Sequence, residues 1–311
     1  MSVKLSLIVP CYNEEGNVEN FLKETRAAMK TYTDSYEIVF VNDGSKDSTP
    51  RKLREIFNEN KDVNIKVINF SRNFGKEAAM YAGFTQAAGE YITIIDADLQ
   101  QDPKYVVEMA KILDSNPDCD MVAAYQAHRK EGKLLSKSKH AFYKTISKMS
   151  GIDFISDASD FRTLRKCVAD TIVALPEYHR FSKGIFSWVG YNTVSIPYEV
   201  RERESGETKW NLKKLASYAL EGIIAYTNKP LKLPVYLGVF LLIISLIFGV
   251  LGLFSPYYSI ISAVFFVGAL VLICQGINGA YLGRVHTQVK DRPIFIAKEI
   301  LTYEHNQKSD N

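Results

Sequence analysis

This 311-residue chain contains a strand pattern that ends in an acidic motif, Tyr91-Ile92-Thr93-Ile94-Ile95-Asp96-Ala97-Asp98-Leu99-Gln100. The stretch begins with five residues that favour a buried strand and runs directly into two carboxylates, Asp96 and Asp98. In an open parallel sheet, ligands bind beyond the carboxyl ends of the strands. Mg²⁺ and Mn²⁺ prefer hard oxygen ligands, which they commonly share with substrate phosphates. The stretch therefore predicts a metal site at the end of a strand, with Asp96, Asp98 and Gln100 as its ligands.

The sequence around this stretch alternates between two patterns. Apolar runs predict strands at residues 4–9, 37–41, 65–70, 91–95 and 121–124. Helical spacing of apolar residues fills residues 14–30, 48–60, 76–88 and 103–113. Such alternation predicts βαβ units and an α/β domain with a mostly parallel sheet.

Polar clusters follow three other predicted elements of this sheet. Residues 10–15 (Pro-Cys-Tyr-Asn-Glu-Glu) follow the first strand, and residues 42–49, which include Asp43, follow the second. Helix capping by Asn13 and an ordinary turn are the alternative explanations for these two clusters. Residues 71–76 (Ser-Arg-Asn-Phe-Gly-Lys) follow the third strand, and they suit either an anionic ligand or a charged helix cap. A lone D-x-D motif is a weak signal, but these clusters place it among candidate ligand-binding loops.

Composition excludes several classes of protein. Lys and Arg number 38 against 35 Asp and Glu, and this balance argues against a nucleic-acid partner bound through bulk charge. Hydrophobic residues make up 47% of the chain, which excludes intrinsic disorder. The four cysteines are scattered, so neither a zinc site nor a disulfide framework is indicated and a reducing compartment is favoured.

The C-terminal part of the chain has a different composition. Residues 233–282 contain no Asp, Glu, Lys or Arg, and a break at residues 254–258 leaves two apolar runs. Each run has roughly 22 to 25 residues, enough to cross a hydrocarbon core of about 30 Å. These runs predict a transmembrane hairpin of two helices, with a buried helical hairpin of a soluble protein as the alternative. Residues 210–228 repeat apolar side chains at helical spacing and carry paired lysines, which predicts an interfacial amphipathic helix or, alternatively, an ordinary surface helix.

Basic residues flank both predicted spans, so the positive-inside rule places both flanks in the cytoplasm. We therefore expect a multi-pass protein of the cell inner (plasma) membrane, with its large domain and both termini cytoplasmic. The chain also enters an apolar strand within a few residues of Met1, so we expect no secretory signal. The expected parts are a cytoplasmic domain (1–209), an interfacial helix and linker (210–232), two transmembrane helices (233–283) and a C-terminal tail (284–311).

Taken in order, these clusters resemble the inverting family-2 glycosyltransferases, which have an A-type, Rossmann-like fold. Asp160-Phe161-Arg162, the segment 203–210 (Arg-Glu-Ser-Gly-Glu-Thr-Lys-Trp), the hairpin and the segment 281–284 (Tyr-Leu-Gly-Arg) extend the likeness. They resemble bacterial polyisoprenyl-phosphate glycosyltransferases, the bactoprenol glucosyltransferase group related to dolichol-phosphate mannose synthase. Ser159 and Thr163 depart from this pattern, since Gly and Leu are common there. The Q-x-x-R-W element of processive family-2 synthases is missing.

The resemblance implies transfer of a sugar, with glucose expected first, from a UDP-sugar to undecaprenyl (polyprenyl) phosphate at the bilayer. The product would serve the modification of cell-surface glycans such as lipopolysaccharide or cell-wall polymers. UDP-N-acetylglucosamine or UDP-galactose remain alternative donors, and a hydroxyl-bearing lipid remains an alternative acceptor. A non-enzymatic alternative is an inactive membrane partner that binds nucleotide sugars. The family commonly oligomerises, so a homo-oligomer is expected.

The resemblance also implies roles for individual residues. Those that would line the nucleobase and ribose pocket are Pro10, Tyr12, Glu14 and Asp43. Those that would hold Mg²⁺ or Mn²⁺ on the diphosphate are Asp96, Asp98 and Gln100. Those that would flank the nucleotide are Arg72, Asn73 and Lys76. Those expected near the sugar, the acceptor and the phosphate charge are Asp160, Arg162, Arg203 and Lys209. Asp160 would orient the sugar or Arg162, with a purely structural salt bridge as the alternative, because a phosphate acceptor is already anionic and needs no strong base.

Overall fold

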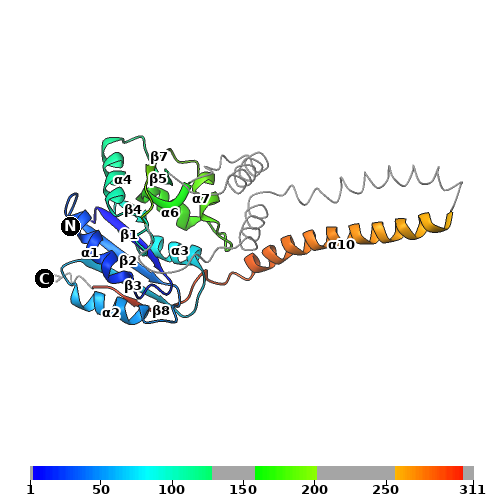
Figure 1. The fold of residues 1–311 in the computed structure, drawn as a ribbon, viewed down its shortest axis with the longest axis horizontal. Coiled ribbons are helices and arrows are strands. Elements are labelled where there is room, and N and C mark those ends of the chain that lie inside the picture. Colours follow the sequence, from blue (N-terminus) through cyan, green and yellow to red (C-terminus); the bar gives the residue numbers. More distant parts are fainter. Residues whose placement is uncertain (1–2, 128–157, 202–255, 304–311) are drawn as a thin grey trace, which may run out of the picture. The chain divides into compact units, whose positions relative to one another are not determined.

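A single mixed sheet of eight strands organises the part of the chain that the computed structural model describes, residues 3–127, 158–201 and 256–303 (Figure 1). The order across the sheet is β7-β5-β6-β4-β1-β2-β3-β8. The strands are β1 (Leu5–Cys11), β2 (Tyr36–Asn42), β3 (Asn64–Phe70), β4 (Tyr91–Ile94), β5 (Met121–Gln126), β6 (Ala158–Arg165), β7 (Thr193–Tyr198) and β8 (Ala297–Leu301).

The four central strands β4, β1, β2 and β3 are parallel, and β5 also runs parallel to β7. Strand β6 lies antiparallel between β4 and β5, and β8 lies antiparallel on β3. The predicted α/β fold with a mostly parallel sheet is therefore confirmed. The three strands that the sequence analysis did not predict, β6, β7 and β8, lie outside the central parallel set β4-β1-β2-β3.

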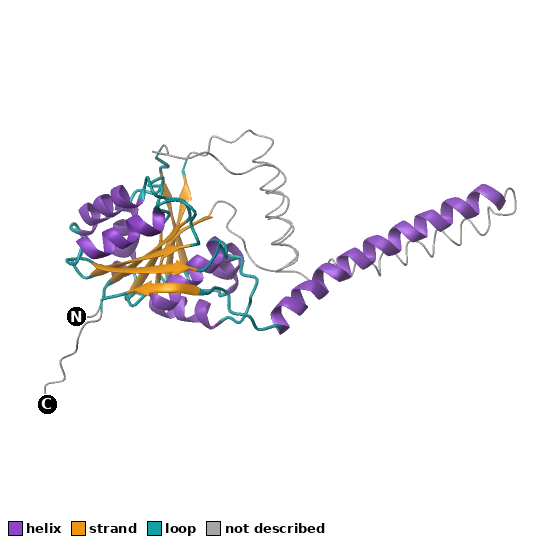
Figure 2. Cartoon of the chain, turned by 90° about the horizontal axis from the view of Figure 1, so that it is seen from below, coloured by secondary structure: helices purple, strands orange, loops and turns teal. Residues whose placement is uncertain are grey.

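The described helices are α1 (Val18–Met29), α2 (Thr49–Glu59), α3 (Lys76–Gln86), α4 (Lys104–Ser115), α6 (Lys166–Ala174), α7 (Ser182–Trp188) and α10 (Pro256–Val289). Helices cover both faces of the sheet (Figure 2). The first four agree with the predicted helical ranges, apart from the ends. The chain divides into two compact units, and the sheet belongs to the unit made of Met1–Lys144, Ile152–Trp210 and Pro293–Asn311.

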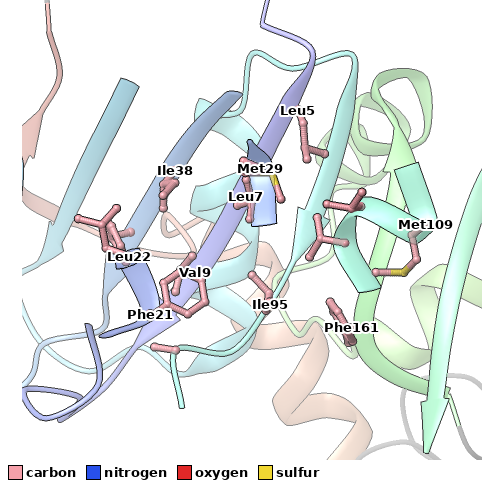
Figure 3. Packing of buried hydrophobic residues seen from close by; sticks show 14 of the residues in the cluster. Leu5, Leu7, Val9, Phe21, Leu22, Met29, Ile38, Ile95, Met109 and Phe161 are labelled. Carbon is pink, nitrogen blue, oxygen red and sulfur yellow. The ribbon is translucent and has the colours of Figure 1, made fainter. Parts of the chain in front are cut away.

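The alternation of side chains along β1 builds a separate core on each face of the sheet. Leu5, Leu7 and Val9 point to the face where Phe21 and Met29 of α1 are also fully buried (Figure 3). Burial of each such side chain contributes about 1.5–3 kcal/mol to stability. The opposite face packs β2 and β3 against the alanines of α3, at residues 78, 79 and 82.

Helix α3 lies unusually close to the sheet because it carries Gly83. A Cβ atom at this position would lie 2.2 Å from Cγ2 of Ile8 in β1. The same close packing fits the small residues that α3 buries beside Gly83, at positions 78, 79 and 82. It also fixes the start of α3, at Lys76, near the carboxyl ends of the central strands.

The chain after α10 returns to the sheet. The sequence analysis assigned residues 284–311 to a tail outside the domain, whereas residues 297–301 form β8 on the open edge of β3. The physical reason is that β3 would otherwise present unpaired backbone groups at the sheet edge. The domain therefore contains a strand that is remote in sequence from its other strands.

The second unit, Thr145–Gly151 with Asn211–Arg292, contains α10. Within the described residues, no helix combines the length and the apolar character needed to cross a membrane. The predicted interfacial helix and the first predicted span lie outside the described residues, and the predicted transmembrane hairpin is not confirmed.

Replacement of Gly83 by alanine tests the close approach of α3 to β1. We expect Gly83→Ala to lower the free energy of unfolding by about 1–3 kcal/mol, because overpacking forces neighbouring atoms to shift. Chemical denaturation of the purified full chain measures this loss. An Ile8→Ala background removes the two nearest atoms, Cγ2 and Cγ1, and leaves only Cβ, 3.1 Å away, so Gly83→Ala should cost clearly less there. An equal cost in both backgrounds would contradict the proposed contact.

Candidate functional site

The acidic motif follows β4 at the carboxyl end of the central strands, as predicted. The backbone N–H of Asp96 donates to Oε1 of Gln101 at 3.0 Å, and Nε2 of Gln101 donates to Oδ2 of Asp96 at 3.3 Å. The N–H of Gln100 donates to Oδ1 of Asp98 at 3.2 Å. Between them, Leu99 has a φ of 56°, in the left-handed region that costs non-glycine residues energy. The loop is therefore held in a tight turn that keeps both carboxylates at the strand end.

Gln101 is a site residue that the sequence analysis missed. Only 7% of it is exposed, and its amide clamps both the backbone and the carboxylate of Asp96. Gln100, the predicted metal ligand, has its backbone engaged on both sides, since its N–H bonds Asp98 and its carbonyl accepts from the N–H of Arg201 at 3.1 Å. Because the two glutamines are adjacent and chemically identical, their different roles could not be predicted from the sequence.

Asp160 of β6 lies opposite Asp96. Strand β6 runs antiparallel to β4 with Ile94 facing Arg162, and continuing this register by two residues brings Asp160 across from Asp96. The side chains of Asp160 and Asp96 are 21% and 32% exposed. The structure thus brings together two predicted site residues from distant parts of the sequence.

Lys76, the first residue of α3, joins the two carboxylates. Its Nζ lies 2.7 Å from Oδ1 of Asp96 and 3.4 Å from Oδ2 of Asp160. Burial acts to lower the pKa of Lys76, but the two carboxylates outweigh it and raise this pKa above its ordinary value. Lys76 therefore carries a permanent positive charge between the carboxylates. The sequence analysis expected it to flank the nucleotide, and its partners in the structure are these two carboxylates.

The charge state of Asp160 follows from its neighbours. Burial acts to raise the pKa of Asp160, but Lys76, Lys183 and Arg162 outweigh burial and hold this pKa below its ordinary value. An ionised carboxylate stabilised by cations is a weak proton acceptor. The environment therefore suits Asp160 for orienting a partner rather than for removing a proton.

Arg162 is buried beneath this group, with 3% of it exposed. Its Nη2 donates to the carbonyl of Ser159 at 2.8 Å, and its guanidinium lies 3.7 Å from the ring centre of Phe186 in α7. Burial lowers the pKa of Arg162 to about 10, although Asp160 acts in the opposite direction. Among the described residues, its Nε has no hydrogen-bond partner. The structure thus places Arg162 below the surface, where it supports the start of β6.

Asp43 holds two loops of the predicted nucleotide pocket together. Its carboxylate accepts from the N–H of Phe74 at 2.6 Å and from the N–H of Gly75 at 3.0 Å, and its own N–H donates to the carbonyl of Cys11. Burial raises the pKa of Asp43 above its ordinary value, although these N–H donors act to lower it. Gly44, with φ of 64°, leaves room for this contact, because a Cβ there would lie 2.3 Å from the backbone of Arg72. Asp43 thus fixes the loop that leads into Lys76.

The other residues predicted for the nucleotide side lie around this clamp. Pro10 is on β1 beside Val41, and Tyr12 and Glu14 are half-buried in the loop that follows β1. The N–H of Glu14 donates to Oγ1 of Thr49 at 2.8 Å. Arg72 and Asn73 are exposed, and the Arg72 guanidinium lies 4.0 Å from the ring centre of Phe74.

Arg203 and Lys209 lie outside the described residues. The described chain nearest to them in sequence ends at Arg201, which is tied to the acidic loop. Its Nη2 lies 2.6 Å from Oδ2 of Asp102, and its Nη1 lies 2.5 Å from Glu24. The described part of the chain therefore reaches the acidic loop at Arg201.

The donor set of this loop fits a divalent cation that is shared with a substrate. Among the residues the structure describes, no three His, Cys, Asp or Glu side chains gather to hold a metal ion. Asp96 and Asp98 supply two carboxylates instead. Mg²⁺ is commonly held by one or two carboxylates together with substrate phosphates, so two carboxylates suffice when a diphosphate completes the shell.

Glu77 is a second residue that the sequence analysis missed. Its carboxylate accepts from the N–H of Ser182 at 3.0 Å and from the Ser182 hydroxyl, at the first residue of α7. Burial and the nearby charge of Asp160 raise the pKa of Glu77 to about 7, although Ser182 and Lys76 act to lower it. Glu77 therefore connects α3 to α7 beneath the Asp96–Lys76–Asp160 group.

Comparison with known proteins adds a family and close relatives. Residues 6–172 match the family described as "Glycosyl transferase family 2". The chain is 36% identical over 314 residues to the uncharacterized glycosyltransferase sll0501 of Synechocystis sp., a match that covers 98% of each chain. It is 35% identical over 307 residues to the SfII prophage-derived bactoprenol glucosyl transferase of Shigella flexneri, covering 96% of this chain and 98% of that one.

A solved structure of glucosyl-3-phosphoglycerate synthase from Mycobacterium tuberculosis, in complex with Mn²⁺, UDP and phosphoglyceric acid, is a more distant match. It has a TM-score of 0.49 and 15% identity over 71% of this chain and 76% of that chain. The relatives thus match over nearly the whole sequence, whereas this structure matches over part of it.

The raised pKa of Glu77 predicts a pH dependence of stability. The ordinary pKa of 4.5 applies to the unfolded chain and a pKa of about 7 to the folded chain. Between these values the folded state holds a proton that the unfolded state has released. The free energy of unfolding should therefore fall as pH rises from about 4.5 to about 7. Denaturation curves across this range should show a clearly smaller slope for Glu77→Gln, whereas Glu59→Gln, at an exposed site on α2, should keep the full slope. An unchanged slope in Glu77→Gln would contradict the assignment.

Proposed function

The chain belongs to glycosyl transferase family 2 and is a glycosyltransferase, and from this premise we propose that it transfers glucose from UDP-glucose to undecaprenyl phosphate. The product is a polyprenyl-phosphate sugar made for the modification of cell-surface glycans. The observation that carries the proposal is the Asp96–Lys76–Asp160 group, where the acidic loop after β4 meets β6. The relative named bactoprenol glucosyl transferase, similar over nearly the whole chain, supports the choice of sugar and acceptor.

The proposed reaction needs no proton transfer. An oxygen of the acceptor phosphate attacks the anomeric carbon, the bond from that carbon to the β-phosphate oxygen breaks, and the electron pair leaves with UDP. The acceptor oxygen is already anionic, so the low pKa of Asp160 is no obstacle. Lys76 holds Asp160 and Asp96 in fixed positions, and Asp160 orients the sugar at the transfer point.

The proposed cofactor is Mg²⁺ or Mn²⁺. Asp96, Asp98 and Gln100 would hold it, and the hydrogen bond from Gln101 to Asp96 would keep that carboxylate in place. When bound, the cation neutralises charge that develops on the departing diphosphate. Arg203 and Lys209 are proposed to add positive charge to the phosphates.

A membrane position is part of the proposal, since a polyprenyl chain stays in the bilayer. Support comes from α10, whose large apolar side chains are exposed to an unusual extent. The exposed ones include Ile260, Val264, Phe266, Val267, Val271, Leu282 and Val285. A row of this kind indicates contact with lipid or another apolar partner. The two-span hairpin, the cytoplasmic orientation and the homo-oligomer are proposed with it.

A transfer assay tests the reaction class and the sugar together. Purified full chain receives undecaprenyl phosphate, Mg²⁺ or Mn²⁺, and one of three labelled donors: UDP-glucose, UDP-N-acetylglucosamine or UDP-galactose. We expect a mild-acid-labile labelled lipid from UDP-glucose, and a loss of about 10²-fold or more in Asp98→Asn. Asp118→Asn, an exposed carboxylate between α4 and β5, is the matched control and should keep full activity.

The other results of this assay point to the alternatives. Transfer from a different donor would replace glucose in the proposal. Transfer to diacylglycerol or ceramide, but not to undecaprenyl phosphate, would favour a hydroxyl-bearing acceptor. UDP binding without any transfer would favour an inactive nucleotide-sugar-binding partner.

Asp160→Asn tests the orienting role of Asp160. The amide keeps the shape of the side chain but removes the ion pair with Lys76, so we expect kcat to fall by about 10²-fold. The Kd for UDP should stay close to the wild-type value, because Asp160 lies on the transfer side of the site. Steady-state kinetics and calorimetric titration with UDP measure the two quantities. Near-normal turnover with unchanged binding would leave Asp160 with a purely structural role.

A further inference from the structure

Strand β8, which follows α10, lies at one end of a line of hydrogen bonds. The other end of this line is in the proposed nucleotide pocket. Strand β8 lies beside β3 at the sheet edge (Figure 1). Within this pair, Glu299 lies directly opposite Asn69. Oε2 of Glu299 accepts from Nδ2 of Asn69 at 3.0 Å and from Nη2 of Arg54 at 2.7 Å. Hydrogen bonding from Arg54 lowers the pKa of Glu299, so the carboxylate is ionised and acts as an acceptor only.

Two buried amides continue this line. Asn69 is 5% exposed and Asn42 is 2% exposed. Oδ1 of Asn69 accepts from Nδ2 of Asn42 at 2.9 Å, and Oδ1 of Asn42 accepts from the backbone N–H of Ser45 at 3.0 Å. The order along the line is therefore Glu299, Asn69, Asn42 and Ser45.

The carboxylate at one end sets the direction of every bond in this line. Because Glu299 accepts only, Asn69 must turn its NH₂ group toward β8 and its oxygen toward Asn42. Asn42 must then donate to Asn69, which leaves its own oxygen for Ser45. If Asn69 turned around, two NH₂ groups would face each other, or Asn42 would also turn and leave the Ser45 N–H without this acceptor. A buried donor without an acceptor is costly, so the orientation at Glu299 reaches Ser45.

The far end of the line fixes two loops at once. Oγ of Ser45 accepts from the N–H of Asn13 at 3.0 Å, and Oδ1 of Asn13 accepts from the N–H of Lys46 at 2.9 Å. These contacts join the loop after β1 to the loop after β2. Both loops carry residues that are proposed to line the nucleobase and ribose pocket, so this step depends on the proposed function.

A second set of contacts from the same segment supports the third loop of the pocket. The ring of Phe295 stacks on Phe70 with centroids 4.9 Å apart, and Phe70 packs edge-on against Phe74 at 5.7 Å. The N–H of Ser71 donates to the carbonyl of Ile296 at 2.9 Å. The loop from Ser71 to Gly75, which Asp43 clamps, therefore rests on residues that follow α10.

We propose that Glu299 is a positioning residue for the nucleotide of the donor. It acts through Asn69 and Asn42 on the turn at Ser45, and it touches neither the sugar nor the acceptor. The nucleotide pocket is thus completed by a strand that lies beyond residues 6–172, the part that matches the family. The expected signature is a weaker affinity for UDP and a higher KM for the donor, with little change in kcat.

Three variants of the full chain test this role by calorimetric titration with UDP and by donor kinetics. Glu299→Leu removes the acceptor and should raise both the Kd for UDP and the donor KM about tenfold, the scale expected for one buried donor left unpaired. Glu299→Gln keeps an oxygen at this position, and the donor Arg54 holds that oxygen toward Asn69, so this variant should restore wild-type values. Lys298→Leu, on the exposed side of the same strand, should also bind UDP as the wild type does.

Several results would overturn the proposal. An unchanged Kd in Glu299→Leu would do so, and so would a Glu299→Gln variant as weak as Glu299→Leu. A fall in kcat at constant KM would show that the residue acts on transfer instead. If Glu299→Leu does not fold, Asn69→Ser breaks the same hydrogen bond from β3 and carries the same expected rise in Kd. Failure of the wild-type chain to bind UDP would refute the proposed donor, a result distinct from any difference among these variants.

Discussion

The site depends on one electrostatic constraint, the placement of Lys76 between Asp96 and Asp160. Two carboxylates that face each other across neighbouring strands would repel, and one of them would take up a proton. The ammonium of Lys76, 2.7 Å and 3.4 Å from them, lets both remain ionised. Lys76 is in turn placed by Asp43, which binds the N–H of Gly75, the residue just before α3. The proposed nucleotide side and the proposed transfer side are thus connected by a short path of two charge-assisted contacts.

The sequence predicted the parts of this site that depend on residues close together in the chain. The apolar run of β4 that ends in Asp96 and Asp98 is such a pattern, and its strand and loop were predicted correctly. The position of Asp160 opposite Asp96 depends on the register of β6 against β4, which no residue of β6 specifies by itself. The same limit applies to Lys76. Its place at a helix start was predictable, but its partners come from the loop after β4 and from β6.

The two residues that depart from the family pattern, Ser159 and Thr163, each find a hydrogen-bond partner on a neighbouring strand. Thr163 replaces a common leucine, and its Oγ1 lies 2.7 Å from Oγ1 of Thr93, the residue directly opposite on β4. A buried hydroxyl without this partner would cost about 1–3 kcal/mol. Ser159 accepts from the N–H of Phe161 and donates to the carbonyl of Ala124 on β5. Each departure was visible in the sequence, but the compensation became visible only with the strand pairing.

Strand β8 shows why a strand of the sheet can resemble a tail in the sequence. Its five residues alternate between half-buried and exposed positions and include two charged residues, Lys298 and Glu299. Such a sequence favours a strand only weakly, so pairing with β3 has to supply the stability. Charged residues on a short edge strand also discourage pairing with another chain. Because side chains alternate along a strand, a slip of one residue would turn Lys298 toward Asn69 in place of Glu299. A donor would then replace the acceptor that Glu299 provides to Asn69, so the register that closes the sheet edge is the same one that allows the hydrogen bonds from Glu299 to Ser45.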